Sequence, residues 1–182
     1  APDSVWSYNN AAFSLAGAII EQVTEQTYEA ALKELVLEPL GLSNAFLQPA
    51  DIMTHRFAAG HSSGEQGMQV AYPWALPRGL WPAGGIICHV KDLLLYARFH
   101  LGDGRTPDVQ RLLSPESMTQ MQSPQVTVWD KEKWGLSWGL GEINGSRRVS
   151  HSGSTKGQNA LLALLPAHDF AMAILTNADH GG

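Results

Sequence analysis

The stretch RRVSHSGSTKGQNALLALLPAHDFAMAILTNAD, residues 147–179, decides the fold that this chain can adopt. Two apolar runs, residues 158–165 and 170–176, each have the length of a strand, and PAHD at 166–169 has the composition of a hairpin turn. Residues 147–151 alternate more weakly between polar and apolar side chains and predict a further strand. These segments therefore predict three consecutive strands of one sheet.

Another strand signal lies earlier in the chain, at WGLSWGL, residues 134–140, which mixes large and small residues between turn residues. The runs at 158–165 and 170–176 are nearly continuous in apolar residues, a pattern typical of a sheet that is covered on both faces. We therefore expect residues 134–179 to form an antiparallel sheet with other elements packed against it.

Helical signals dominate before about residue 125. Asn10 stands immediately before a broad apolar face at helical spacing and is predicted to cap that helix. Thr27 is predicted to cap a second helix, which ends where residues 39–41, Pro-Leu-Gly, interrupt the periodicity. Ser114, followed by proline at the first helical position, predicts a short helix through about Gln122.

Residues 43–80 are rich in Gly, Ser, Pro and polar side chains and show no sustained period, so they predict a long surface loop. Loops of this length are often functional. Helices first and strands last predict an α+β domain, mainly helical and loop-forming over residues 1–125 and strand-rich over residues 134–179.

The composition is that of a globular protein. Of the 182 residues, 44% are hydrophobic and 16% are charged, which suits one domain with a buried core and argues against a disordered chain. The formal charge of -5 and the scattered basic residues argue against a nucleic-acid partner. The apolar run at residues 160–165 stops at Pro166, far short of the ~20 residues that a membrane span needs, so we expect no span.

Cys88 is the single cysteine, which excludes an intrachain disulfide. This fits a reducing compartment as well as a secreted fold without disulfides, so the localisation stays open between cytoplasmic and periplasmic or extracellular. Cys88 and Lys91 have the spacing of a nucleophile–lysine pair. Gly84-Gly85 before them and the apolar spacing after them instead predict a loop that leads into an amphipathic helix.

The sequence indicates no metal site and no cofactor site. The seven histidines include no H-E-x-x-H pair, one cysteine cannot form a Cys-rich zinc site, and the glycines match neither a dinucleotide-binding nor a P-loop fingerprint. We expect the tryptophans mainly in the core, with an apolar acyl-binding pocket as the alternative. They are Trp6, Trp74, Trp81, Trp129, Trp134 and Trp138.

Two short motifs lie about 140 residues apart, Tyr8-Asn9-Asn10 and His151-Ser152-Gly153. Read as Y-x-N and H-x-G, they resemble two of the three active-site motifs of the serine β-lactamase and penicillin-binding-protein superfamily, in its class C-like branch of esterases and D-peptidases. The third motif, S-x-x-K, carries the nucleophile. None of the five lysines has a serine three positions before it, so this chain lacks that motif.

The resemblance continues between and beyond the motifs in the same order, over residues 10–42, 80–101, 134–142 and 150–179. It implies a β-lactamase/transpeptidase-like fold, of which residues 1–182 would be a partial catalytic domain, the C-terminal portion without the S-x-x-K helix. The family's first strands and its N- and C-terminal helices would also lie outside. Without them, we expect exposed strand edges and an exposed apolar sheet face.

The resemblance implies catalytic roles for three residues. Tyr8 matches the tyrosine that shares the base work with the S-x-x-K lysine, and a phenol, with an ordinary pKa of ~10, needs nearby cations for this role at neutral pH. Asn10 matches the asparagine that orients the substrate's acyl side chain or holds the catalytic lysine. His151 replaces the lysine of K-T-G, and its variable charge could bind an anionic substrate or stabilise a phenolate.

Residues 152–154 are expected to bind substrate by the same resemblance. Ser152 is the middle residue of the motif, and Gly153, which has no side chain, would let the substrate backbone lie against the strand. Ser154 would offer its backbone N–H to the oxyanion. Plainer structural interpretations remain for the catalytic candidates: a half-buried aromatic residue, a helix cap and a strand histidine.

Two functional hypotheses follow. In the first, the full protein is a serine acyl hydrolase that acts through an acyl-enzyme on small-molecule ester, peptide or β-lactam substrates, and a preceding segment or a companion chain supplies S-x-x-K. This chain alone would then be inactive. In the second, the chain is a non-catalytic binding or assembly module that keeps the fold. Histidine in the place of the K-T-G lysine favours ester or peptide substrates over efficient β-lactam hydrolysis.

Overall fold

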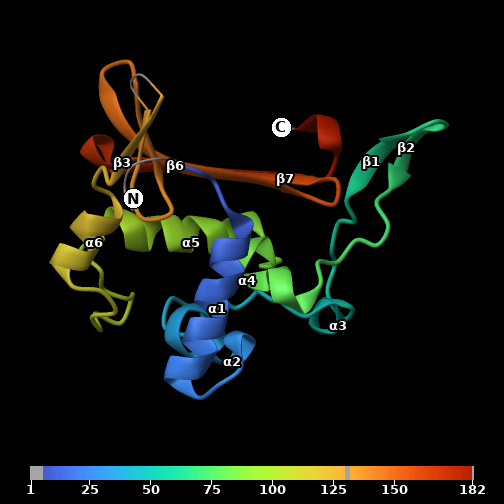
Figure 1. Ribbon diagram of the computed structural model, residues 1–182, viewed down its shortest axis with the longest axis horizontal. Helices are drawn as coiled ribbons and strands as arrows, with labels where there is room; N and C mark the ends of the chain where they lie inside the picture. Colours follow the sequence, from blue (N-terminus) through green and yellow to red (C-terminus); the bar gives the residue numbers. More distant parts are fainter. Residues whose placement is uncertain (1–5, 130–131, 182) are drawn as a thin grey trace.

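The computed structural model describes residues 6–129 and 132–181, and it places helices against one side of an antiparallel sheet (Figure 1). Most helical elements precede the sheet along the chain, and several are single 3-10 or π-helical turns. They are α1 (Asn10–Thr24), α2 (Tyr28–Leu32), η1 (Lys33–Leu37), α3 (Pro49–Ile52), η2 (Arg78–Leu80), α4 (Trp81–Gly84), α5 (Val90–Leu101), α6 (Pro115–Met121), η3 (Pro166–His168) and η4 (Asp179–Gly181).

The main sheet has six antiparallel strands whose spatial order follows their order in the sequence. They are β3 (Val126–Trp129), β4 (Glu132–Trp134), β5 (Gly139–Ile143), β6 (Ser146–Thr155), β7 (Gln158–Leu165) and β8 (Phe170–Thr176). A separate hairpin consists of β1 (His61–Gly64) and β2 (Gly67–Val70) and projects from one end of the molecule (Figure 1). The α+β class predicted from the sequence is therefore confirmed.

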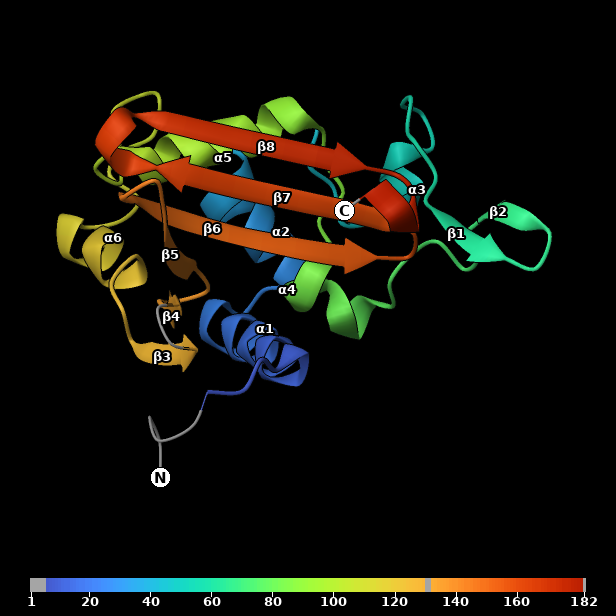
Figure 2. The same cartoon turned by 90° about the horizontal axis from the view of Figure 1, so that it is seen from above.

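The last three strands form the long, regular part of the sheet (Figure 2). The two apolar runs predicted as strands coincide with β7 and β8, and the strand predicted at residues 147–151 lies within the longer β6. Lys156 and Gly157 turn the chain between β6 and β7 with positive φ angles of 41° and 71°. Glycine suits this turn because it has no Cβ, and a Cβ at 157 would overlap the backbone of His61.

The strand predicted at residues 134–140 is wrong in its continuity. β4 ends at Trp134, a turn follows, and β5 begins at Gly139. Tertiary contact explains the interruption: Leu136 donates its backbone N–H to the carbonyl oxygen of Met121 at 2.9 Å, and Ser137 adopts a positive φ of 65°. The end of α6 therefore draws this segment away from the sheet.

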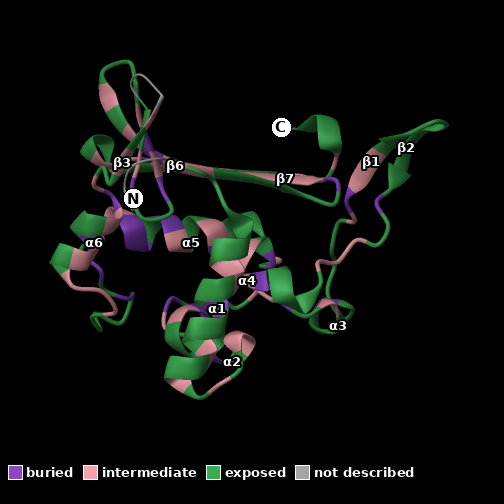
Figure 3. Cartoon of the chain, viewed as in Figure 1, coloured by how far each residue is buried: buried purple, intermediate pink, exposed green. Residues whose placement is uncertain are grey.

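One face of the sheet carries α5, and the main core lies between them (Figure 3). Residues of alternate positions on the strands point toward this helix, as the two-residue period of a strand requires. The buried members of this core are Ala97, Trp138, Leu140, Val149, Leu162 and Leu164. A second cluster joins the loop after η1 to α5 and α6 and contains Leu37, Leu40, Leu42, Phe99 and Met118.

The opposite face of the sheet is exposed in this chain. Phe170, Met172 and Ile174 alternate along β8 and are exposed, and Phe170 retains 51% of its accessible surface. The nearly continuous apolar runs predicted a sheet covered by other elements on both faces, but among the described residues only the face toward α5 is covered. The expected exposed apolar sheet face is therefore present.

The N-terminal cap of α1 is Asn9, so the prediction of Asn10 as the cap is wrong by one residue. The Asn9 side-chain oxygen accepts hydrogen bonds from the backbone N–H groups of Ala11 and Ala12 at 2.9 and 3.3 Å. Asn10 is the first helical residue. Asn9 therefore satisfies helix amides that would otherwise lack partners, and the Asn10 side chain is not needed for that purpose.

Two other predicted caps are confirmed. Thr27 accepts a hydrogen bond from the Ala30 backbone N–H, and Ser114 accepts one from Ser117 before Pro115 opens α6. The long loop predicted at residues 43–80 is only partly correct, because this segment also forms α3, the β1–β2 hairpin and η2. Those elements are three or four residues long, too short for a periodic pattern to reveal them.

Cys88 lies just before α5, as the amphipathic pattern predicted. His89 caps the helix by accepting the Asp92 backbone N–H at Nδ1, 3.2 Å away. Burial raises the pKa of the Cys88 thiol to about 11, and the neighbouring Asp92 carboxylate acts in the same direction. The thiolate is therefore scarce at neutral pH, and this argues against the nucleophile interpretation.

Candidate functional site

The fold brings Tyr8 and His151 together, although 143 residues separate them in the sequence. The Tyr8 hydroxyl lies 3.5 Å from His151 Nε2, and the two ring centroids are 6.1 Å apart. Tyr8 belongs to the extended segment immediately before α1, whereas His151 lies in the middle of β6. The two predicted motifs therefore meet at one place on the surface, where β6 is the long strand nearest to α1 (Figure 2).

The second half of β6 is a free strand edge on the side of β5. Pairing with β5 runs only from Ser146 to Ser150, so residues 151–155 have no partner in β5. On the other side, β6 pairs with β7 along residues 149–155. An unpaired edge presents backbone N–H and C=O groups that an extended peptide-like ligand can bind.

The three predicted substrate-binding residues lie on this free edge. Ser152, Gly153 and Ser154 are all exposed. A Cβ placed on Gly153 would meet no atom within 4 Å, so no internal contact of the described chain requires glycine there. The space beside Gly153 is open, which is the arrangement needed for a substrate backbone to approach the strand.

The imidazole of His151 is partly withdrawn from water. Burial lowers the pKa of His151 below its ordinary value, and a hydrogen bond involving the Ser152 backbone partly opposes this shift. The ring is therefore mainly neutral at pH 7. A neutral imidazole that carries its proton on Nδ1 can accept the phenolic hydrogen of Tyr8 at Nε2. This geometry favours hydrogen bonding over charge stabilisation of a phenolate.

Asn10 is exposed and is the first residue of α1, two positions after Tyr8. Because Asn9 caps the helix, the Asn10 amide is not committed to the backbone of the first turn. The conflict between a capping role and a substrate-orienting role, which the sequence raised for this residue, is therefore resolved in favour of an available side chain.

Two tryptophans complete an aromatic cluster around the Tyr8–His151 pair. Trp134 contacts His151 with ring centroids 5.8 Å apart and Tyr8 at 6.1 Å, both nearly edge to face. Trp6 lies 5.6 Å from Trp134 and 6.4 Å from Tyr8. Sequence patterns did not distinguish Trp134 from the other tryptophans, and the local signal that marks it is Gly139, which the indole contacts across the turn.

A small cavity of about 170 Å³ adjoins His151. Its lining combines apolar surface, two serines and an ion pair in which Arg148 lies 3.3 Å from Glu132. The lining residues are Glu132, Trp134, Gly139, Leu140, Arg148, Ser150, His151, Ser152 and Leu161. The cavity therefore extends the free edge of β6 toward Trp134.

The other tryptophans differ in their environments. Trp81 and Trp138 are buried, as expected for core residues. Trp74 stacks on Phe57 with centroids 5.8 Å apart and planes inclined by 23°. Among the tryptophans whose burial the structure describes, which do not include Trp129, the core interpretation therefore holds for Trp81 and Trp138, while Trp6 and Trp134 surround the Tyr8–His151 pair.

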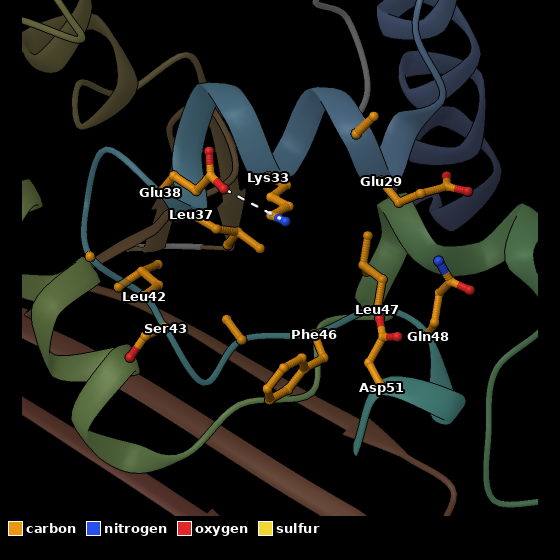
Figure 4. A pocket seen from close by; sticks show the side chains of 13 residues that line it. Glu29, Lys33, Leu37, Glu38, Leu42, Ser43, Phe46, Leu47, Gln48 and Asp51 are labelled. Carbon is orange, nitrogen blue, oxygen red and sulfur yellow. Dashed lines mark ion pairs between the residues drawn. The ribbon is translucent and has the colours of Figure 1, made fainter. Parts of the chain in front are cut away.

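A larger cavity of about 740 Å³ lies between the α2–η1 segment and the loop at residues 41–51 (Figure 4). Its floor is apolar, with Leu37, Leu42, Phe46 and Leu47, and the Lys33–Glu38 ion pair at 3.6 Å stands at its rim. None of the predicted site residues lines it. Size alone therefore does not identify the candidate site in this chain.

Neither a group of potential metal ligands nor a membrane-crossing helix is found in the part of the chain that the structure describes. Over residues 6–129 and 132–181, no group of three or more His, Cys, Asp or Glu side chains could hold a metal ion. Within the same residues, no helix combines the length and apolar character that crossing a membrane requires.

Comparison with known proteins identifies the family of the chain. The sequence model of the Beta-lactamase family matches residues 1–182, and the chain therefore belongs to that family. The relative named Penicillin-binding protein 4, from Amycolatopsis lactamdurans, is 33% identical over 97% of this chain and 48% of its own length. The chain thus spans about half the length of this relative.

Two solved structures share the fold. The octameric penicillin-binding protein homologue from Pyrococcus abyssi matches with a TM-score of 0.85 and 24% identity, over 98% of this chain and 40% of its own. The D-stereospecific amidohydrolase from Streptomyces sp. matches with a TM-score of 0.82 and 23% identity, over 100% and 53%. The β-lactamase/transpeptidase-like fold and the superfamily that the two motifs indicated are therefore confirmed.

Proposed function

We propose that residues 1–182 are a partial catalytic domain of a serine acyl hydrolase that forms an acyl-enzyme. The observation that carries the proposal is the meeting of Tyr8 and His151 beside the free edge of β6. Acyl transfer needs a nucleophile, a proton-transfer group and donors for the oxyanion. This chain supplies candidates for the last two, and the nucleophile and its lysine come from an S-x-x-K segment outside these residues.

Each site residue then has a defined task. Tyr8 accepts the proton of the serine nucleophile at its phenolic oxygen while its own hydrogen passes to Nε2 of the neutral His151, and the reverse transfers protonate the leaving group. Asn10 orients the acyl side chain of the substrate. Ser152 and Gly153 border the substrate backbone, and the Ser154 N–H contributes to the oxyanion hole.

The S-x-x-K segment is expected to dock on α1. Leu15, Ile19 and Val23 recur every four residues along this helix and retain 63%, 55% and 77% of their accessible surface. An apolar stripe of this regularity is typical of a helix–helix contact. A helix that covers the stripe would carry a nucleophile close to Tyr8, which lies immediately before α1. Either a preceding segment or a companion chain can meet this requirement.

The charge state of the site favours esters, amides and peptides as substrates. A lysine at the first position of this motif provides a permanent positive charge for an anionic substrate, whereas burial lowers the pKa of His151 and keeps it mainly neutral. Efficient binding of a β-lactam carboxylate is therefore less favoured. One protein with the same fold is named as a D-stereospecific amidohydrolase, which agrees with amide substrates.

The test is an intact-mass spectrum of the native protein before and after reaction with a fluorophosphonate, which labels activated serines. We expect an adduct on a serine outside residues 1–182, in the same polypeptide or in a companion chain. An adduct within the 182 residues would contradict the assignment of the nucleophile. No adduct on any chain would replace the hydrolase with the non-catalytic binding or assembly module.

A further inference from the structure

Trp134 is fixed by the sheet on both sides. Its backbone pairs with Val126 of β3 and with Gly139 of β5, and its carbonyl oxygen accepts the Gln125 backbone N–H at 2.8 Å. The indole lies over Gly139, where a Cβ would come within 3.2 Å of Trp134 Cζ3. A Cβ at position 139 would also come within 3.2 Å of the Ser150 carbonyl oxygen, so the indole would have to shift by a few tenths of an ångström to accept it.

Tyr8 has much weaker support. It belongs to the segment before α1, outside any helix or strand, and 47% of its surface is exposed. Its hydroxyl is 3.5 Å from His151 Nε2, the longest distance at which a hydrogen bond still contributes. A bond of this length cannot by itself hold the phenol in one orientation, so ring packing must contribute.

The Trp134 indole is well placed to provide that packing. It meets the Tyr8 ring at 85° and the His151 ring at 75°, with both centroid distances close to 6 Å. Edge-to-face contacts of this kind favour one relative orientation of the rings. The indole, the imidazole and the Glu132–Arg148 ion pair line the same small cavity.

We propose that Trp134 is a positioning residue, which holds the Tyr8 phenol and the His151 imidazole in the relative orientation needed for proton transfer at the free edge of β6. Its effect on catalysis rests on the proposed function. The effect on the two rings does not, because it concerns the geometry of this chain alone. Gly139 contributes to this positioning, since the absence of a side chain there leaves space for the indole against β5.

The first measurement is the NMR titration of the His151 imidazole in the native protein. Trp134→Ala removes the indole, and Gly139→Ala displaces it without removing it. We expect the His151 pKa to rise toward its ordinary value in both variants, because water reaches the ring. Trp74→Ala is the matched control, since Trp74 stacks on Phe57 and not on the Tyr8–His151 pair. An unchanged His151 pKa in both test variants would overturn the proposal.

A second measurement separates positioning from folding. Trp134→Phe keeps an aromatic ring in place, so its His151 pKa should lie between those of the native protein and Trp134→Ala. If Trp134→Ala does not fold, Trp134→Phe and Gly139→Ala decide the question. A His151 pKa equal to the native value in these two variants would again contradict the positioning role.

The third measurement is steady-state kinetics in the protein that contains the nucleophile. Misplacing a proton-transfer group lowers kcat by about 100-fold, so Trp134→Ala should reduce kcat strongly while KM changes much less. The acid limb of the kcat profile should also move upward with the His151 pKa. A loss confined to KM would overturn the positioning role. If the native protein has no turnover, the proposed function fails, whereas the NMR titration still decides whether Trp134 positions the pair.

Discussion

Among the described residues, two histidines each contact at least two aromatic rings, yet only one of them belongs to the candidate site. His100 is 3% exposed and contacts Tyr96, Phe99 and Trp138 at centroid distances of 4.5, 5.2 and 5.0 Å. We call these four residues the core cluster. The edge cluster, which consists of His151, Tyr8, Trp6 and Trp134, has centroid distances near 6 Å and stands on the free edge of β6.

The difference lies in access and in hydrogen bonding. Burial lowers the pKa of His100 to about 4, and its Nδ1 has no hydrogen-bond partner among the described residues. Burial also lowers the pKa of His151, but this ring has the Tyr8 hydroxyl on one side and a small cavity on the other. Aromatic burial neutralises both histidines. Function requires, in addition, a polar partner and a route for substrate.

The largest expected effect that sharpens this comparison comes from Tyr8→Phe. In the protein that contains the nucleophile, removing a positioned proton-transfer group should lower turnover by about 10²- to 10⁴-fold. The free energy of unfolding should change by less than about 0.5 kcal/mol, because the hydroxyl is exposed. Ester or amide turnover and a denaturant titration measure the two effects. Unchanged turnover would remove the assigned role of Tyr8, and Tyr72→Phe, at an exposed tyrosine outside the edge cluster, is the control.

The core cluster should respond to Trp138→Ala in its stability instead. Trp138 is buried against α5 and contacts both Tyr96 and His100, so its removal leaves a cavity. We expect a loss of about 3–5 kcal/mol in the free energy of unfolding. Trp134→Ala in the edge cluster should lose less, because Trp134 is only partly buried. Equal losses in the two variants, measured by urea denaturation, would abolish the distinction between the clusters.

Acid should destabilise the protein through the core cluster. The pKa of His100 is lowered from 6.5 to about 4 on folding, so the unfolded state binds more protons between these values and stability falls as the pH falls through this range. The full shift corresponds to about 3 kcal/mol. Denaturant titrations from pH 7 to pH 4 measure the slope.

His100→Gln should flatten that slope, because it removes the group whose pKa is lowered on folding. His151 also makes the protein less stable as the pH falls, because its pKa is lowered in the folded state. A slope that persists undiminished in His100→Gln would show that another group causes the acid sensitivity.

The smallest expected effect is the difference in stability between variants of two neighbouring asparagines next to the edge cluster. Asn9→Ala removes the cap of α1 and should cost about 1 kcal/mol of stability. Asn10→Ala should leave stability unchanged, because the Asn10 amide is not used in the cap. It should lower activity, because the proposed role of that amide is to orient the substrate. Thermal unfolding and turnover of both variants measure the contrast. A stability loss in Asn10→Ala as large as that in Asn9→Ala would favour a structural role for both residues.

Local patterns predicted the regular elements well. The correct predictions depend on residues that are close in sequence, where a side chain interacts with the neighbouring backbone. They are the apolar runs of β7 and β8, the caps at Thr27 and Ser114 and the amphipathic helix after Cys88. One error has a tertiary cause, because the break between β4 and β5 follows from the contact with Met121. The other is local, because Asn9 and not Asn10 accepts the N–H groups of the first turn of α1.

The sequence by itself determined the family, the strand-rich end and the candidate residues Tyr8, Asn10 and His151, because motifs and periodicity are local properties of the chain. Only the tertiary structure decided that Tyr8 and His151 meet, that pairing with β5 stops at Ser150 and that Trp134 rests on Gly139 against both rings. These facts depend on contacts between segments far apart in sequence. Such contacts are set by the packing of the sheet, and they cannot be predicted from any single stretch of residues.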